Sequence, residues 1–228
     1  FCVWKFSKEN EPKWKTELGV GRPGWHIEDT AISEYYFGPQ YDLHGAGIDL
    51  KFPHHEAEIA QQESASGKKP FVKIWMHVGT LTINGKKMSK SLKNFISVEN
   101  FLENHPPEFF RWLILNYHYR SPLDYTEKAL NQSKESFAKI QEILDKLNFV
   151  IDKAKTSNRQ DKMDKLENIR KQIYNALDDD FNTPRALAAI FDLVNRINKK
   201  MWSLSKSEAV IDKNFIVAHL SILGFKLT

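Results

Sequence analysis

The sequence contains a single cysteine, Cys2, among its 228 residues. A disulfide needs two cysteines and a CxxC zinc knuckle needs at least two, so neither can form within this chain. We therefore expect a reducing compartment, by default the cytoplasm. The chain also lacks any run of about 18 apolar residues, so we expect no membrane span. Its first residues, FCVWKF, are too short an apolar stretch for a signal peptide.

Glycine and proline are scarce in the second part of the chain. After about residue 130 only Pro184 and Gly224 remain, whereas both residue types are frequent before residue 100. Because glycine and proline interrupt helices, this contrast predicts a mixed α/β segment followed by an all-helical one. The chain also begins at Phe1 rather than at a methionine, and we expect it to be a fragment of a longer protein.

Composition alone sets few limits on function. A hydrophobic content of 41%, with 12% aromatic residues, is enough to bury a core, most simply as one domain plus a smaller one. The formal net charge of +4 suits a polyanionic partner but does not require one.

The α/β segment is expected to contain a strand, a glycine turn and a helix. Residues 41–44 read as a short strand that enters a turn containing Gly45 and Gly47. Pro53 then stands where the first turn of a helix tolerates proline, which predicts a helix over residues 54–64.

The second part shows helical periodicity from residue 98 onward. Thr183 is expected to cap one helix, with Pro184 at its first position, and residues 153–164 are expected to form a polar connection. The expected helices of this part cover residues 127–152, 166–177, 186–204 and 211–223, the last ended by Gly224. We expect three segments: an α/β segment over residues 1–97, a connecting helical segment over 98–126 and a helical bundle over 127–228.

Two patterns indicate chemistry. Residues 87–91 read KMSKS and follow the turn Asn84-Gly85, and such a basic loop with hydroxyls can close on a polyphosphate. The alternative is an ordinary solvated lysine-rich turn. His54 and Glu58 are four residues apart, so on a helix they share a face and can clamp one divalent cation. The alternative is an exposed pair at a helix start, where acidic side chains favour the helix dipole.

Several blocks occur together in a fixed order: GRPGWHIE, DLHGAGIDL, FPHHEAEIAQ, WMHVGTL and KMSKSLKN, followed by NYHYRSPLDY and LDDDFNTP. In this order they resemble the second half of the cysteinyl-tRNA synthetases, a family of class I aminoacyl-tRNA synthetases. The resemblance implies the second half of a Rossmann-like catalytic domain followed by an all-α helix bundle on the tRNA side.

The resemblance implies a ligase that activates L-cysteine with ATP and Mg²⁺ as cysteinyl adenylate. The cysteinyl group then passes to the 3' end of tRNA(Cys). Lys87 and Lys90 would stabilise the departing pyrophosphate, with Lys90 the direct ATP contact and Met88 and Ser89 in the same ATP-binding loop. The His-x-Gly-His loop of class I enzymes is missing, so we expect this fragment alone to be inactive. By analogy with bacterial relatives we expect a monomer.

The remaining implied site residues come from the earlier blocks. Gly45 and Gly47 would allow close backbone approach to the nucleotide, and Asp49 would accept from ribose hydroxyls. Trp25 and His44 match residues near the bound cysteine.

The resemblance also implies one zinc ion per subunit, which selects cysteine through its thiolate, because serine is nearly isosteric with cysteine. His54 and Glu58 fall on two zinc ligands of the family, and a third ligand is a cysteine that we expect in the N-terminal half that this sequence does not contain. Asp29 stands where the family has a cysteine ligand. An aspartate oxygen is an accepted zinc ligand, so we expect zinc to be retained, and the alternative is an empty site.

Two other functions are compatible with these motifs. One is a related ligase that joins cysteine to a glucosaminyl-inositol, against which the long helical tail argues. The other is a tRNA-binding paralogue without catalysis, which only Asp29 favours.

Overall fold

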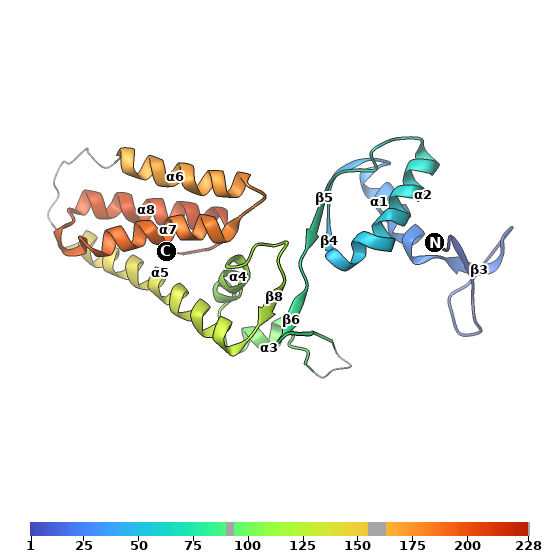
Figure 1. The fold of residues 1–228 in the computed structure, drawn as a ribbon, viewed down its shortest axis with the longest axis horizontal. Coiled ribbons are helices and arrows are strands. Elements are labelled where there is room, and N and C mark those ends of the chain that lie inside the picture. The colour runs from blue at the N-terminus through green and yellow to red at the C-terminus, as the bar shows by residue number, and fades with distance from the viewer. Residues whose placement is uncertain (90–93, 155–162, 228) are drawn as a thin grey trace. The chain divides into compact units, whose positions relative to one another are not determined.

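The computed structural model describes residues 1–89, 94–154 and 163–227 (Figure 1). These residues form two compact units, Phe1–Thr80 and Leu81–Thr228. The division therefore falls before the KMSKS loop, whereas the sequence expectation set its first boundary after residue 97. No helix in the described ranges is long and apolar enough to cross a membrane.

The first unit opens with a small antiparallel sheet that the sequence did not reveal. Its strands are β1 (Trp4–Phe6), β2 (Trp14–Thr16) and β3 (Gly19–Pro23), with β3 in the middle. Strands this short carry too few residues to show alternation. Helix α1 (Trp25–Phe37) follows directly, and a Cβ on its capping residue Gly24 would collide with the carbonyl oxygen of Cys2. Glycine thus lets α1 start against the sheet.

The centre of the first unit is a β-α-β arrangement, which confirms the expected α/β class. Strand β4 (Tyr41–Gly47) pairs in parallel with β5 (Val72–Val78). Between them lie a short 3-10 turn (Ile48–Leu50), a π-helical turn (Lys51–His55) and helix α2 (Glu56–Ser66).

Two expectations about this arrangement were wrong. Gly45 and Gly47 lie inside β4 rather than in a turn, because they continue the ladder opposite Met76 and Val78. Helix α2 begins at Glu56 rather than at residue 54, because extended backbone at Phe52 (φ −139°, ψ 132°) interrupts its approach.

The second unit begins with a three-stranded sheet in the order β7-β6-β8. Strand β6 (Leu81–Ile83) forms a hairpin with β7 (Lys86–Lys87) and pairs in parallel with β8 (Leu123–Tyr125). Helices α3 (Val98–Leu102) and α4 (Pro107–Leu115) lie between β7 and β8 in the sequence.

Four helices complete the second unit, as the apolar periodicity predicted. They are α5 (Glu127–Lys153), α6 (Met163–Asp178), α7 (Thr183–Asn198) and α8 (Lys206–Ile222). Helices α7 and α8 pack against the long α5, and α6 packs against α7, on the side away from α5 (Figure 1). Trp112 of α4 is fully buried in the same core and packs against Phe137, Phe191 and Phe225.

Several helix ends differ from the expectation. The side chain of Asn182, not Thr183, caps α7 by accepting from the backbone N–H of Arg185. Helix α7 stops at Asn198, because Lys200 leaves the helical region (φ −126°, ψ 12°) before a 3-10 turn over Met201–Ser203.

Helix α8 starts five residues earlier than expected. Ser205 and Glu208 form a reciprocal capping box at its N-terminus, which fixes the start at Lys206. Gly224 follows the helix at a φ of 83°, as its expected role requires. The central part of the expected connection 153–164 lies outside the described residues, while Lys153 ends α5 and Met163 begins α6.

Candidate active site

A cluster of one imidazole and two carboxylates joins α1 to the start of α2. The Nε2 atom of His54 lies 2.9 Å from Asp29 Oδ2 and 3.2 Å from Glu58 Oε1. The side chains of His54 and Glu58 are almost fully buried, whereas that of Asp29 is 38% exposed. The predicted ligand set is therefore brought together, with one ligand accessible from outside.

Aromatic rings fix the orientation of His54. The Trp25 ring stacks on the His54 ring at 4.2 Å, and His26 Nδ1 lies 2.5 Å from His54 Nδ1. Because Nδ1 is engaged by His26, Nε2 is the nitrogen that faces the two carboxylates. The buried Thr30 hydroxyl, which donates to the carbonyl oxygen of His26 and contacts Gln61 Oε1, helps to hold α1 against α2.

The electrostatics of this cluster favour a cation. Burial, with a smaller contribution from Asp29, raises the pKa of Glu58 to about 7. Glu58 Oε2 is buried, and none of the described residues donates a hydrogen bond to it. Ligand atoms of a tetrahedral zinc ion, each about 2.0–2.2 Å from the metal, lie roughly 3.4 Å apart. The observed separations are close to this, so the donor set fits zinc.

His44 lies at the edge of the same cluster. Its Nδ1 is 2.5 Å from the Tyr41 hydroxyl, and its ring packs edge-on against His55 at 4.9 Å. Burial lowers the pKa of His44, with His54 as a further cause. His44 is thus linked to His54 through His55, whose ring lies 5.6 Å from that of His54. Both predicted pocket residues, Trp25 and His44, border the cluster.

Three further residues belong to this cluster and were missed from the sequence. His55 Nδ1 lies 2.8 Å from His77 Nε2, and the Trp75 ring packs 4.7 Å from His55. Burial lowers the pKa of His55 to about 4, so the ring is neutral. Trp75 and His77 are two residues apart in β5 and therefore lie on one face of the strand. This spacing is the sequence signal that could have placed them together.

The two glycines of β4 are not required by contacts within this chain. A Cβ at Gly47 would lie 2.6 Å from Asp49 Oδ1, but this atom is the end of an exposed side chain that can turn away. At Gly45 the nearest atom to an added Cβ is Met76 O, at 4.0 Å, an ordinary contact. Close approach of the nucleotide to Gly45 and Gly47 therefore stays a prediction.

The KMSKS loop belongs to the second unit, and its base is held by two polar side chains. Asn94 accepts from the backbone N–H of Ser89 and donates to the carbonyl oxygen of Lys87. Asp124 Oδ1 accepts from Gly85 N at 2.9 Å and from the Thr82 hydroxyl at 2.8 Å.

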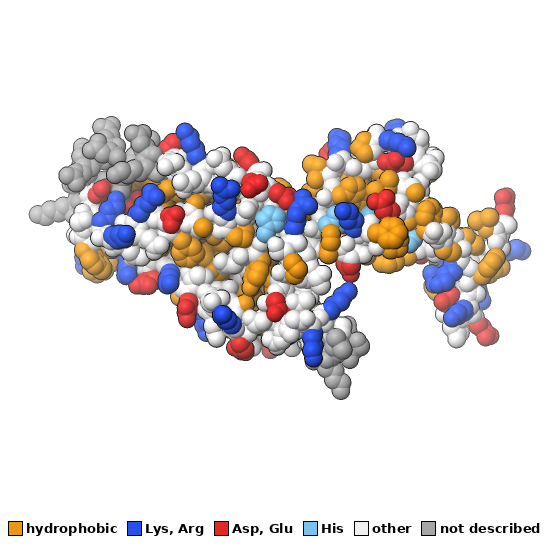
Figure 2. All heavy atoms as spheres, viewed as in Figure 1, with side chains coloured by type: hydrophobic (Ala, Val, Ile, Leu, Met, Phe, Trp, Pro, Cys, Tyr) orange, Lys and Arg blue, Asp and Glu red, His pale blue; other side chains and the backbone are white. Residues whose placement is uncertain are grey.

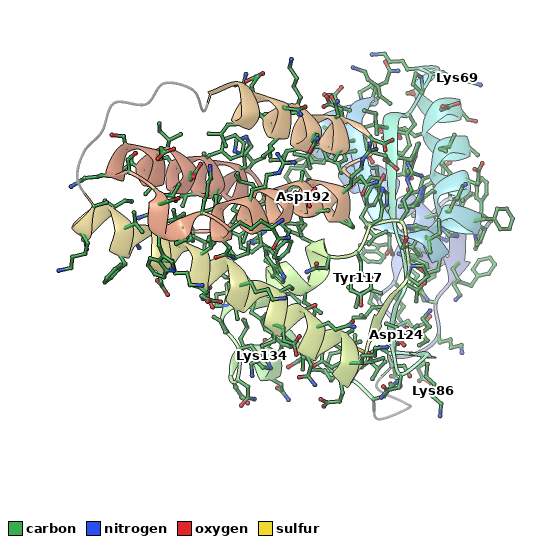
Figure 3. All side chains as sticks on the ribbon, turned by 60° about the vertical axis from the view of Figure 1, so that its left-hand side comes forward. Lys69, Lys86, Tyr117, Asp124, Lys134 and Asp192 are labelled. Carbon is green, nitrogen blue, oxygen red and sulfur yellow. The ribbon has the colours of Figure 1, made fainter. Side chains whose placement is uncertain are left out.

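Figure 3 shows Asp124 near the hairpin and Lys86 pointing away from the helices. Lys87 is exposed, Met88 and Ser89 are half-buried, and Lys90 lies outside the described residues. Asn94 and Asp124 were not singled out from the sequence, although both stand inside the blocks KMSKSLKN and NYHYRSPLDY.

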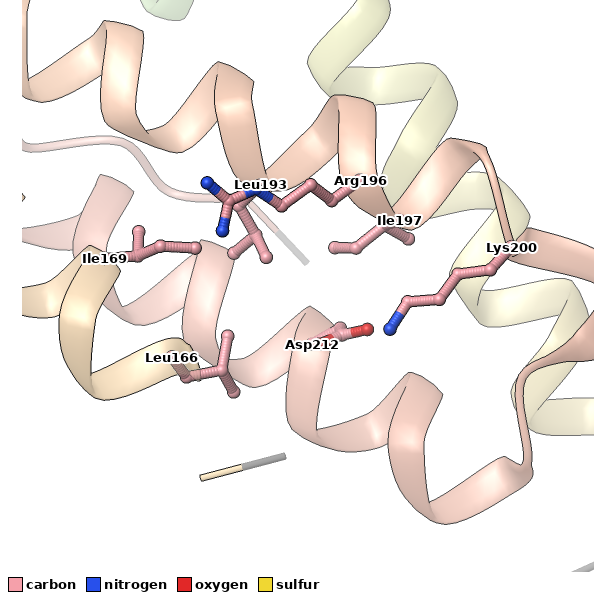
Figure 4. Close-up of a pocket in the computed structure, with 7 residues that line it drawn as sticks. All are labelled: Leu166, Ile169, Leu193, Arg196, Ile197, Lys200 and Asp212. Carbon is pink, nitrogen blue, oxygen red and sulfur yellow. The ribbon is translucent and has the colours of Figure 1, made fainter. Parts of the chain in front are cut away.

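The helical unit has a small cavity of its own among α6, α7 and α8. Figure 4 shows the Lys200 amino group and the Asp212 carboxylate pointing toward one another at its edge. The remaining lining residues are Leu166, Ile169, Leu193, Arg196 and Ile197. On the face seen in Figure 2, lysine and arginine are interspersed with aspartate and glutamate over the described part of this unit.

Comparison with known families assigns both parts of the chain. Residues 1–135 match the family described as tRNA synthetases class I (C) catalytic domain, and residues 172–228 match the DALR domain.

Curated proteins are similar to most of this chain. The chain is 43% identical to a cysteine–tRNA ligase of Thermococcus gammatolerans over 219 residues, which are 93% of this chain and 46% of the relative. Over 212 residues it is also 43% identical to that of Methanococcus maripaludis (strain S2), covering 91% and 44%. For the ligase of Legionella pneumophila (strain Corby), 43% identity extends over 87% and 41%. The chain thus spans about half the length of these relatives.

A solved structure has a similar fold. The LeuRS of Agrobacterium radiobacter K84, in a ternary complex with tRNA and LeuAMS, aligns with a TM-score of 0.67 at 15% identity. The alignment covers 92% of this chain and 32% of that one. At this identity the likeness concerns the fold alone.

Proposed function

Because the chain belongs to the class I (C) family of tRNA synthetases and ends in a helical DALR domain, we propose that it is the second half of a cysteine–tRNA ligase. Such an enzyme activates L-cysteine with ATP and Mg²⁺ and transfers the cysteinyl group to tRNA(Cys). The observation that carries the proposal is the clustering of Asp29, His54 and Glu58, which offers a cation-binding site beside Trp25 and His44.

In this proposal Asp29, His54 and Glu58 hold zinc, which when bound supplies a direct bond to the substrate thiolate. The exposed edge at Asp29 leaves access for the substrate, while the buried Glu58 contributes charge. Trp25 covers one face of His54 and keeps its Nε2 directed at the carboxylates. His44 is placed to hold the amino acid by a hydrogen bond, with Tyr41 fixing its ring.

The loop residues act on the nucleotide. Lys87 and Lys90 stabilise the charge that develops on pyrophosphate when the cysteine carboxylate attacks the α-phosphorus. Met88 and Ser89 form the ATP-facing backbone between them, and Asn94 holds the start of this segment through two hydrogen bonds.

The remaining nucleotide contacts come from the first unit. Gly45, Gly47 and Asp49 form the nucleotide side of the site, where Asp49 accepts from ribose hydroxyls.

The helical part is proposed to contact tRNA. A DALR domain after the catalytic part favours a tRNA acceptor over a glucosaminyl-inositol acceptor, because a small acceptor needs no extended helical unit. Asp29 remains the single feature in favour of a tRNA-binding protein without catalysis.

A spectroscopic experiment tests the amino-acid site on this chain directly. The chain carrying Cys2→Ser is loaded with Co²⁺ and titrated with L-cysteine and, separately, with L-serine. We expect a thiolate-to-cobalt charge-transfer band with cysteine only, which Asp29→Asn or Glu58→Gln weakens. No band with either amino acid would contradict the proposed selection mechanism. Cysteine-dependent pyrophosphate exchange and tRNA charging by the longest native protein that contains this chain then test the full reaction.

A further inference from the structure

We propose that one face of the small N-terminal sheet, formed by Lys5, Lys15 and Arg22 and called here the cationic face, binds phosphates near the 3' end of the acceptor RNA. Lys5 and Arg22 are direct cross-strand partners, and Lys15 is the partner of Val20, two residues before Arg22. Because cross-strand partners and residues two apart share one face of a sheet, the three cations lie on the same side. The inference rests on the proposed function in taking RNA as the partner.

The charge of the cationic face is not balanced within the sheet. The three strands contain three cations and no aspartate or glutamate. Glu11, in the loop before β2, lies 3.5 Å from Arg22, whereas Lys5 and Lys15 form no ion pair with the described residues. Like charges directly opposite one another destabilise a sheet, and Lys5 stands opposite Arg22. A polyanion bound on this face would offset their repulsion.

The cationic face is open to solvent. Lys5 and Lys15 are exposed, and Val20 between the cations is 48% exposed. The ring of Trp4 lies on the opposite face, where a Cβ added to Gly21 would come within 2.6 Å of its Nε1 atom. The sheet therefore has an aromatic side and a cationic side, and the cationic side is free to meet a charged partner.

The sheet is anchored to the start of the candidate amino-acid site. The Gly24 N–H donates to the carbonyl oxygen of Val3 at 2.9 Å, which ties β1 to the beginning of α1. The next residue is Trp25, whose ring stacks on that of His54. An RNA that receives the cysteinyl group brings its 3' end to this site, so its last phosphates approach the cationic face.

The side chains on the cationic face favour contacts to the backbone rather than to bases. A lysine ammonium is a mobile point charge, and contacts to phosphates position a nucleic acid without reading its sequence. We therefore expect the cationic face to strengthen RNA binding equally for different stem sequences.

The test measures how RNA binding depends on salt. The chain with Cys2→Ser is compared with the same chain carrying Lys5→Gln or Lys15→Gln, each titrated at several salt concentrations with a short RNA hairpin that has a single-stranded 3' tail. Each lysine substitution should weaken binding and reduce the slope of log K against log salt by roughly 0.7–1, because one phosphate contact and its released counterion are lost. Lys5→Gln should not lower the midpoint of urea unfolding, because it removes the repulsion from Arg22.

The matched control is Lys73→Gln. Lys73 lies in β5 of the same unit, its side chain is 65% exposed, and it pairs with Asp42 at 2.8 Å. This variant should keep the affinity and the salt slope of the parent chain. A hairpin with a different stem sequence should give the same changes as the first.

Three results would overturn the cationic face. They are no binding of the hairpin by the parent chain, unchanged affinity and slope in both lysine variants, and an equal loss in Lys73→Gln. The cobalt band with L-cysteine, recorded on the same variants, follows the amino-acid site separately. If the band is absent while the lysine variants lose slope, the cationic face stands and the proposed amino-acid site does not.

Discussion

Replacing Trp112 by alanine should remove a large part of the stability of the helical unit. The Trp112 side chain is fully buried, packs against three phenylalanines at 5.6 to 5.7 Å, and donates from Nε1 to the Ser136 hydroxyl at 2.8 Å. Burying about 150–250 Å² of aromatic surface at about 25 cal/mol per Å² stabilises by roughly 4–6 kcal/mol. Measured Trp→Ala changes in cores cost about 3–5 kcal/mol. The two ranges overlap at about 4–5 kcal/mol, which is the expected loss.

The assay is urea unfolding followed by circular dichroism at 222 nm, because the substitution removes a fluorophore and the signal comes mainly from the helices. The matched control is Trp202→Ala, since Trp202 is 73% exposed and its ring lies edge-on to that of Phe149. We expect the control to cost less than about 1 kcal/mol. Equal losses in the two variants, or a Trp112 loss under about 1 kcal/mol, would refute the packing argument.

Three further outcomes are expected. Asp29→Cys should tighten zinc binding by roughly 10-fold or more, because a thiolate replaces a carboxylate oxygen, and chelator competition measures the change. Asp124→Ala should speed hydrogen exchange at the Gly85 amide by roughly 10- to 100-fold, because a hydrogen bond to a charged group contributes about 1.5–3 kcal/mol. Asp180 has a pKa lowered by Arg120 and then by Tyr119, so its contribution to stability is present above the unfolded pKa and lost as pH falls through the folded one. Asp180→Asn, which suits its φ of 56°, should therefore flatten the dependence of the unfolding midpoint on pH below about pH 4.

Two of these predictions have a control within the chain. For Asp29→Cys the background is Cys2→Ser, so that the only thiol is the introduced one. Asp192→Ala, on an exposed position of α7, should leave Gly85 exchange unchanged. Zinc binding that weakens with Asp29→Cys would show that residue 29 does not face the ion. If the unfolding midpoint of Asp180→Asn depends on pH below about pH 4 as that of the parent chain does, the pairing of Asp180 with Arg120 and Tyr119 is not the cause of that dependence.

The helices of the second unit could be predicted from the sequence, because each of them buries one face and its apolar residues recur with helical spacing. The apolar spacing of Phe137, Ile140, Leu144 and Leu147 fixed α5 within one residue at its C-terminal end. Helix ends were predicted less well, because capping depends on which of several adjacent polar residues leaves the helical region and accepts from a free backbone N–H group of the first turn. Asn182 stands next to Thr183 and took that role.

The sequence predicted that Asp29, His54 and Glu58 lie together, but it did not predict their surroundings. The spacing of His54 and Glu58 placed them on one face, and the resemblance added Asp29. The contact between His55 and His77 joins the turn before α2 to β5, and no local pattern specifies how these two segments meet.

One consequence follows from the way β8 leads into α5. Tyr125 ends the strand, Thr126 caps the helix, and α5 then runs for 27 residues, about 40 Å. The same strand carries Asp124, which holds the turn of the lysine hairpin. The start of α5 and the turn between β6 and β7 are thus tied to the same three-residue strand, so the position of the long helix and that of Lys86 and Lys87 are set by one short stretch of backbone.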